Sequence, residues 1–113
     1  MVYIREAHPE DGWVMPRNQQ QGINIKDPKT LEERTQVATK ACTLLHIKLP
    51  CVVDGMDDKV NKAYAAWPDR IYIVDKDGKI VVAGNQGPAG FAPSVQTARQ
   101  WLEKLGEEAK AAK

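Results

Sequence analysis

Most features that would assign this chain to a specialised class are scarce in its sequence. Only two of its 113 residues are cysteines, too few for a disulfide scaffold, and they lack CxxC spacing. No apolar run is long enough to cross a bilayer, and the N-terminus lacks the charged-then-apolar pattern of a signal peptide. These absences predict a soluble protein, with the cytoplasm as its default location.

An excess of charge of one sign is also missing. The 16 Lys and Arg residues nearly balance the 15 Asp and Glu residues, and no basic stripe interleaved with aromatic residues is present. Nucleic acid and membranes are therefore not expected partners. No Cys and His set has zinc spacing, so no metal is expected. The length predicts a single domain over residues 1–113.

The segment YIREAHPEDGW, residues 3–13, carries the first chemical signal. A strand is expected over residues 2–7, and because side chains alternate along a strand, Glu6 and His8 should share one face. Pro9 then ends the ladder. A carboxylate and an imidazole at the mouth of a strand suit acid/base chemistry. Their spacing alone fits an ordinary polar strand end somewhat better.

A first helix is predicted after a long polar connection over residues 9–29. Thr30 and Glu33 have the spacing of a capping box, in which each side chain satisfies a free backbone N–H group. The helix that follows has one apolar stripe, and a short β-branched strand is expected over residues 51–53, after Pro50.

The second half of the chain contains the clearest local signals. A helix capped by Asp57 or Asp58 precedes two β-rich runs joined by an Asp-Gly turn, which predicts a hairpin over residues 70–83. A final helix is expected to be capped by Ser94 and to fray from Gly106. The predicted order is therefore β-α-β-α-β-β-α.

This order resembles the C-terminal part of a thioredoxin-like domain. Five segments narrow the resemblance to the iodothyronine deiodinase family, and they cover nearly the whole chain in order: YIREAHPEDGW (3–13), LEER (31–34), CVVDGMDDKVNKAY (51–64), DRIYIVDKDGKIVVAGNQGPAGF (69–91) and ARQWLEKL (98–105). The EAHP-DGW segment and the GxxGPxG loop are its most specific landmarks. The resemblance implies an α/β, thioredoxin-like fold.

The family's chemistry implies a selenocysteine or cysteine nucleophile, on a strand-helix unit upstream of the segment that matches Val2. We therefore expect a fragment that lacks this unit, N-terminally truncated relative to the family and inactive by itself. An upstream UGA codon read as a stop is one explanation, and a genuine or engineered fragment is the other. Loss of an inner strand exposes sheet edges, which predicts a homodimer or a rearranged sheet.

The resemblance also implies roles for individual residues. Glu6 and His8 match the family's active-site pair, for proton transfer and for holding substrate near the nucleophile. Asp69 is a candidate third carboxylate, or else a solvated residue. Trp13 is a candidate wall of a substrate pocket, or else a packing residue. Gln86 stands in the substrate loop where animal members carry an arginine, which argues against thyroid hormone as the natural substrate.

The two cysteines and one proline complete the set of candidates. Cys51 is a possible resolving thiol or an ordinary packing residue, whereas Cys42 is expected to be a small buried hydrophobe. Pro68 lies next to the place where many thioredoxin-like proteins keep a cis-proline.

The implied function is a deiodinase-like oxidoreductase domain. Its parent would reduce a halogenated aromatic, a peroxide or a disulfide, with a thiol reductant as co-substrate and no cofactor. The alternative is a non-catalytic thioredoxin-like domain that dimerises or binds a partner.

Overall fold

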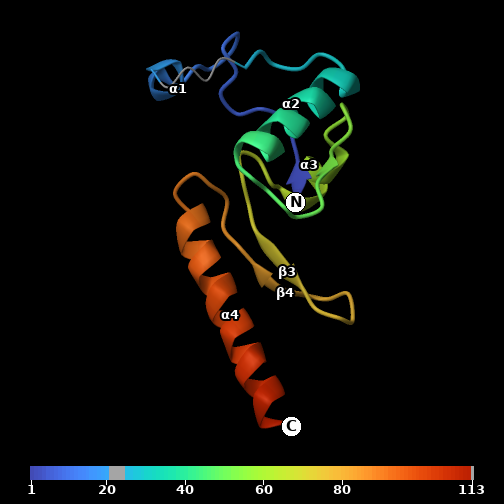
Figure 1. The fold of residues 1–113 in the computed structure, drawn as a ribbon, viewed down its shortest axis with the longest axis vertical. Helices are drawn as coiled ribbons and strands as arrows, with labels where there is room; N and C mark the ends of the chain where they lie inside the picture. The colour runs from blue at the N-terminus through green and yellow to red at the C-terminus, as the bar shows by residue number, and fades with distance from the viewer. Residues whose placement is uncertain (21–24, 113) are drawn as a thin grey trace. The chain divides into compact units, whose positions relative to one another are not determined.

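The computed structural model describes residues 1–20 and 25–112, which form two compact units, Met1–Tyr64 and the chain from Ala65 onward (Figure 1). The elements, in order, are β1 (Val2–Tyr3), α1 (Pro16–Gln20), α2 (Leu31–Leu44), β2 (Val52–Val53), α3 (Lys59–Tyr64), β3 (Tyr72–Val74), β4 (Ile80–Ala83) and α4 (Phe91–Ala111). Helices combined with two small sheets make an α/β arrangement, as predicted at that level.

The sheet of the first unit is parallel and two-stranded. Val2 lies opposite Val52 and Tyr3 lies opposite Val53. The backbone N–H of Asp54 continues the ladder by donating to the Tyr3 carbonyl over 2.9 Å. Helix α2 packs against β2 and covers this small sheet.

Strand β1 is shorter than the prediction of residues 2–7. It ends at Tyr3, so Glu6 and His8 lie beyond the strand, and the alternation argument that placed them on one strand face is wrong. The physical reason is the length of its partner. Strand β2 has only two residues, and the Asp54 N–H makes the last hydrogen bond of the ladder.

The connection predicted over residues 9–29 contains a short helix, α1, rather than irregular chain alone. Residues 21–24 of it lie outside the described residues. Two hydrogen bonds join its ends. The Glu10 N–H donates to the Ile25 carbonyl, and the Asp27 N–H donates to the Asp11 carboxylate, each over 2.7 Å.

Helix α2 begins as predicted. The Thr30 hydroxyl accepts from the Glu33 N–H over 3.2 Å, while the Glu33 carboxylate accepts from the N–H of Lys29, one residue earlier than in a standard capping box. The residues that α2 buries are Arg34 and Ala38.

Helix α3 is capped by a residue that the sequence pattern did not identify. Asp54 accepts from the N–H groups of Val60 and Asn61, over 3.0 and 2.9 Å, and only 1% of its surface is exposed. Of the two predicted caps, Asp57 makes a longer contact of 3.3 Å to the Lys59 N–H. The prediction missed Asp54 because it lies five residues before the helix, beyond normal capping distance.

Arg34 joins α2 to the β2–α3 connection. Its side chain is 4% exposed, and Nη1 donates to the carbonyl oxygens of Asp54 and Gly55 over 3.2 and 2.8 Å. The same nitrogen lies 3.1 Å from an Asp58 carboxylate oxygen, in an ion pair that is mostly buried. A buried guanidinium requires such partners, so α2, β2 and α3 share one polar centre.

The second unit contains the predicted hairpin. Strands β3 and β4 are antiparallel, and the Asp75 carboxylate closes the turn by accepting from the N–H groups of Asp77 and Lys79. Gly78 has a φ of +80°, a conformation that glycine adopts without strain. The Trp67–Pro68 and Gly87–Pro88 peptide bonds are cis.

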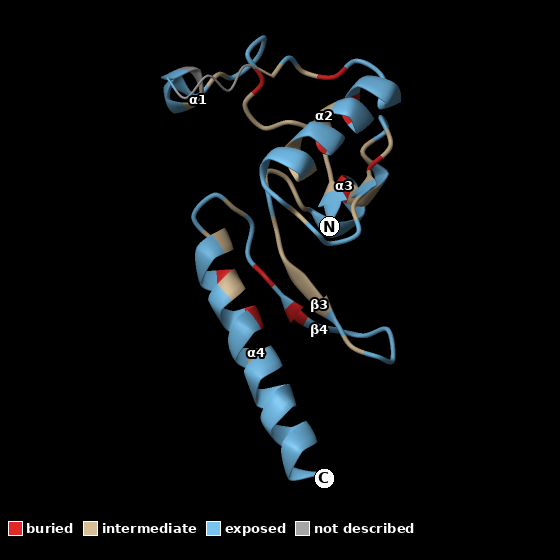
Figure 2. Cartoon of the chain, viewed as in Figure 1, coloured by how far each residue is buried: buried red, intermediate tan, exposed pale blue. Residues whose placement is uncertain are grey.

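Helix α4 packs against β4 and starts earlier than predicted. Ser94 lies inside the helix rather than at its cap. Its hydroxyl donates to the Gly90 carbonyl over 2.6 Å and accepts from the Asn85 N–H over 2.8 Å. The helix also continues through Gly106 instead of fraying there, and its last turns are exposed (Figure 2).

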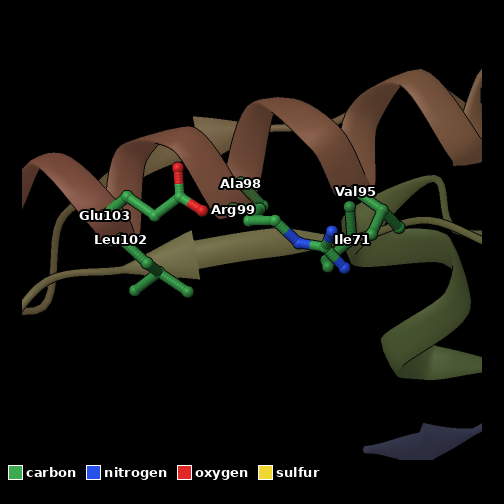
Figure 3. Close-up of a pocket in the computed structure, with 6 residues that line it drawn as sticks. All are labelled: Ile71, Val95, Ala98, Arg99, Leu102 and Glu103. Carbon is green, nitrogen blue, oxygen red and sulfur yellow. The ribbon is translucent and has the colours of Figure 1, made fainter.

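A shallow apolar depression of about 440 Å³ lies between α4 and the chain just before β3 (Figure 3). Its lining residues are Ile71, Val95, Ala98, Arg99, Leu102 and Glu103. None of them is among the predicted site residues. Among the helices that the structure describes, none has the length and hydropathy needed to cross a membrane.

Replacing Asp54 tests the cap of α3. Asp54→Ala leaves the N–H groups of Val60 and Asn61 without their acceptors, so the free energy of unfolding should fall by about 1–3 kcal/mol. Urea denaturation followed by far-UV circular dichroism measures it. The control is Asp57→Ala, which removes one exposed contact and should change stability by less than about 0.5 kcal/mol. Equal losses from both variants would contradict the assignment of the cap.

Candidate functional site

A tight turn brings His8 and Trp13 together. The Gly12 N–H donates to the Pro9 carbonyl over 3.2 Å, which folds the chain back on itself. His8 Nδ1 then lies 2.9 Å from the Trp13 carbonyl oxygen, and the two rings meet edge to face with centroids 4.7 Å apart. The two predicted site residues are thus direct neighbours.

This contact determines which nitrogen of His8 is available for chemistry. A carbonyl oxygen only accepts hydrogen bonds, so Nδ1 must carry a hydrogen. In the neutral ring Nε2 then holds the lone pair, and in the imidazolium it holds a proton that can be transferred. Within the described part of the chain, Nε2 makes no hydrogen bond. His8 is therefore positioned to exchange a proton through Nε2.

The indole of Trp13 is mostly open to solvent, with 69% of the residue exposed. The packing alternative considered from the sequence does not describe it well, because packing residues are largely covered. An exposed indole beside an imidazole offers an aromatic surface to a planar ligand.

Two hydrogen bonds hold the base of the same segment. The Asp27 N–H donates to the Asp11 carboxylate, and this hydrogen bond lowers the pKa of Asp11 because it stabilises the ionised form. The neighbouring Glu10 N–H bonds the Ile25 carbonyl. Both hydrogen bonds lie a few residues after His8, where they restrain the turn.

Glu6 is half-buried, and its environment disfavours ionisation. Burial raises the pKa of Glu6 and the nearby Asp27 raises it further, while the Arg34 guanidinium opposes them. Glu6 therefore retains its proton to higher pH than an ordinary glutamate. Such a carboxyl group is a candidate proton donor, two residues before the histidine.

Asp69 and Gln86 are brought together in the second unit. The Gly87 N–H donates to the Asp69 carbonyl over 2.9 Å, and Gln86 Nε2 donates to the Trp67 carbonyl over 3.1 Å. A Cβ added at Gly87 would meet the Asp69 carboxylate, which would have to turn away, so the two residues lie close together in this loop. Asp69 and Gln86 are both exposed at the surface of this unit.

The two cysteines lie together in the first unit. Both are half-buried and line one opening, and the Cys51 thiol donates to the Val52 carbonyl oxygen over 3.8 Å. Burial raises the pKa of Cys51, and the contact with Cys42 raises it further. Neither thiol lies at a helix N-terminus, since Cys42 is in the last turn of α2.

Known proteins are similar to this chain over nearly all of the residues described above. The profile of the family described as iodothyronine deiodinase matches residues 1–106. This chain belongs to the iodothyronine deiodinase family. The resemblance inferred from its motifs is thereby confirmed.

Individual members of the family are also similar in sequence to this chain. The type II iodothyronine deiodinase of Rattus norvegicus is 36% identical over 106 residues, which are 92% of this chain and 39% of that protein. The thyroxine 5-deiodinase of Sparus aurata is 39% identical over 107 residues, 92% of this chain and 36% of that protein. The type II enzyme of Fundulus heteroclitus is 40% identical, over 91% of this chain and 38% of its own. The chain thus spans less than two fifths of the length of these relatives.

Sequence reasoning overlooked Arg34 and Asp54 as residues that build the site. Arg34 is the last residue of the LEER segment, and Asp54 directly follows β2 in the CVVDG segment. Arg34 contributes to the electrostatics of Glu6, and Asp54 fixes the connection that Arg34 binds. One signal in the sequence could have identified both residues. Each is a charged residue inside a family segment that otherwise has a helical or β-branched pattern. Among the described residues, no cluster of His, Cys, Asp and Glu suits a metal ion.

The raised pKa of Glu6 makes stability depend on pH. Because the folded pKa lies above the ordinary value of 4.5, ionising Glu6 favours the unfolded chain. Its contribution is therefore most favourable below that value and is lost as pH rises through the folded pKa. Glu6→Gln should remove this loss, so its stability relative to the native chain should increase between about pH 4 and pH 7.

Urea denaturation at a series of pH values measures this difference. The matched control is Glu10→Gln, which neutralises an exposed carboxylate in the same segment and should show no comparable increase. A Glu6→Gln stability difference that does not vary with pH would refute the assignment.

Proposed function

We propose that this chain provides the proton-transfer part of a deiodinase-like, thiol- or selenol-dependent reductive site. The observation that carries the proposal is the hydrogen bond between His8 Nδ1 and the Trp13 carbonyl, which leaves Nε2 to exchange a proton. Glu6, with its raised pKa, is a second proton donor of the same segment. Family membership supports redox chemistry of the deiodinase kind.

The substrate we propose is a halogenated aromatic compound. The exposed Trp13 indole can stack on such a ring next to the imidazole. Relatives of this chain are named for iodothyronine and thyroxine. Here the loop residue Gln86 is a neutral amide whose nitrogen already binds the Trp67 carbonyl, so it offers no cation to a carboxylate group. We therefore favour an aromatic halide without such a group. A peroxide or a disulfide is the alternative substrate class.

The reaction requires a proton as well as electrons. A selenolate or thiolate attacks the halogen, the carbon–halogen electron pair passes to carbon, and this carbon takes a proton to become C–H. Two thiols then reduce the chalcogen–halogen bond, which releases halide, two protons and a disulfide and regenerates the selenolate or thiolate. One of these protons replaces the proton given to carbon. Imidazolium His8 supplies the proton to carbon from Nε2, and Glu6 belongs to the same proton-donating set. Asp69 is proposed as a further site carboxylate.

The attacking nucleophile is proposed to lie outside these 113 residues. Cys42 and Cys51 are the two cysteines of the chain, and neither is placed for the role. Cys42 lies in the last turn of α2 rather than at a helix N-terminus, and burial raises the pKa of Cys51. Cys51 remains a possible resolving thiol. The proposed framework for this chemistry is a thioredoxin-like fold.

Replacing the two histidines in turn tests the proposal. His8→Asn should reduce thiol-dependent dehalogenation by about 10²–10⁴-fold, the usual contribution of a positioned acid or base. His46→Asn is the matched control, because His46 is exposed at the end of α2 and its φ of +52° suits asparagine. The assay uses an iodinated or brominated phenol with dithiothreitol, and measures halide release.

The assay is run on the 113-residue chain and on a gene product extended upstream to include a Sec or Cys strand-helix unit. Activity in the extended protein that survives His46→Asn but not His8→Asn supports the proposal. Equal activity of both variants refutes the role of His8. Activity in neither protein supports the alternative, a non-catalytic domain that dimerises or binds a partner.

We also propose that the chain forms a homodimer. Both units expose large apolar side chains at the surface, among them Val52, Val74, Ile80, Leu102 and Leu105. Exposed strand residues and helix leucines of this kind are commonly covered by another copy. Size-exclusion chromatography with light scattering should give twice the mass of one chain at micromolar concentration. A well-folded monomer across the concentration series would contradict this.

A further inference from the structure

Two cysteines from different elements meet at one cavity of the first unit. Cys42 lies in the last turn of α2, Cys51 directly precedes β2, and α2 packs against β2. Both line an opening of about 330 Å³, together with Thr39, Ile47 and Val53. The Cys51 thiol donates to the Val52 carbonyl oxygen over 3.8 Å, and the neighbouring Cys42 thiol contributes to the raised pKa of Cys51. Neither side chain is fully buried, so small molecules in solution can reach the pair.

We propose that Cys42 and Cys51 form a redox-active dithiol, which exchanges with small disulfides of the glutathione class to give an intramolecular disulfide. Both side chains line the same opening between a helix and a strand that pack together, so the bond would close within the first unit. The proposal does not rest on the proposed dehalogenation, because the exchange needs no halogenated substrate and no residue outside this chain.

The order of attack follows from the environment of the thiols. Burial and the neighbouring Cys42 raise the pKa of Cys51, so Cys51 keeps its proton to higher pH than an ordinary thiol, and the first attack is assigned to Cys42. The Cys42 thiolate attacks one sulfur of the small disulfide, whose S–S bond breaks and releases one thiolate. Cys51 then loses its proton to solvent and attacks the Cys42 sulfur, which releases the second thiolate.

Atoms and electrons balance in this exchange. One small disulfide and two protein thiols give the Cys42–Cys51 disulfide and two small thiols, and two electrons pass from the protein to the small molecule. A thiol of the same class reverses the reaction. The oxidised form would connect the end of α2 covalently to the start of β2. Strand β2 pairs with β1, and β1 leads directly to Glu6 and His8.

Peptide mapping of the full chain tests the proposal. The protein is equilibrated in oxidised and reduced glutathione at a series of ratios, and free thiols are then trapped with iodoacetamide. At oxidising ratios alkylation of both cysteines should fall by about tenfold, and the intact mass should decrease by two hydrogen atoms. A non-reduced tryptic digest should contain residues 41–48 linked to residues 49–59. Reduction should separate the two peptides.

Single variants provide the controls. In Cys42→Ser and Cys51→Ser the remaining thiol should form only a mixed disulfide with glutathione, and no linked peptide should appear. Circular dichroism of each reduced variant checks that the fold is retained. Complete alkylation of both cysteines at every ratio would overturn the proposal, as would a linked peptide found only in a covalent dimer on a non-reducing gel. Either result leaves the His8 experiment unaffected.

Discussion

The buried guanidinium of Arg34 is the constraint on which the first unit depends. A cation with 4% exposure must be surrounded by acceptors, and here they come from the Asp54 and Gly55 carbonyls and the Asp58 carboxylate. These groups lie between β2 and α3, so satisfying one charge fixes the position of α2 relative to both. The same charge also acts on Glu6 and limits how far burial raises its pKa.

Asp54 makes three different kinds of contact that stabilise the first unit. Its N–H continues the β1–β2 ladder, its carbonyl accepts from Arg34, and its carboxylate caps α3. The backbone groups that bind the carboxylate outweigh its burial, so the pKa of Asp54 lies below the ordinary value. Two of the motifs that relate this chain to the deiodinase family thus meet in a single buried polar network, with Arg34 from one and Asp54 from the other.

Local rules predicted the elements whose causes are local. The hairpin follows from the Asp-Gly turn, and the start of α2 follows from Thr30. The cap of α3 and the end of β1 depend on tertiary partners. The spacing of apolar and polar residues along the sequence does not reveal such partners. The candidate site also depends on both local and tertiary causes. Chemistry singled out His8, but its orientation comes from a turn that returns the Trp13 carbonyl to the ring. Likewise, the two cysteines line one opening only because the end of α2 and the start of β2 fold together.

The hydrogen bonds from Glu10 to Ile25 and from Asp27 to Asp11 have a consequence for how this region can vary. They close the base of a long connection immediately after the histidine. Loop entropy grows slowly with length, by about 0.6 kcal/mol for each doubling. The chain between Trp13 and Ile25 can therefore be lengthened or shortened at small cost, while the Trp13 carbonyl keeps its contact with the imidazole.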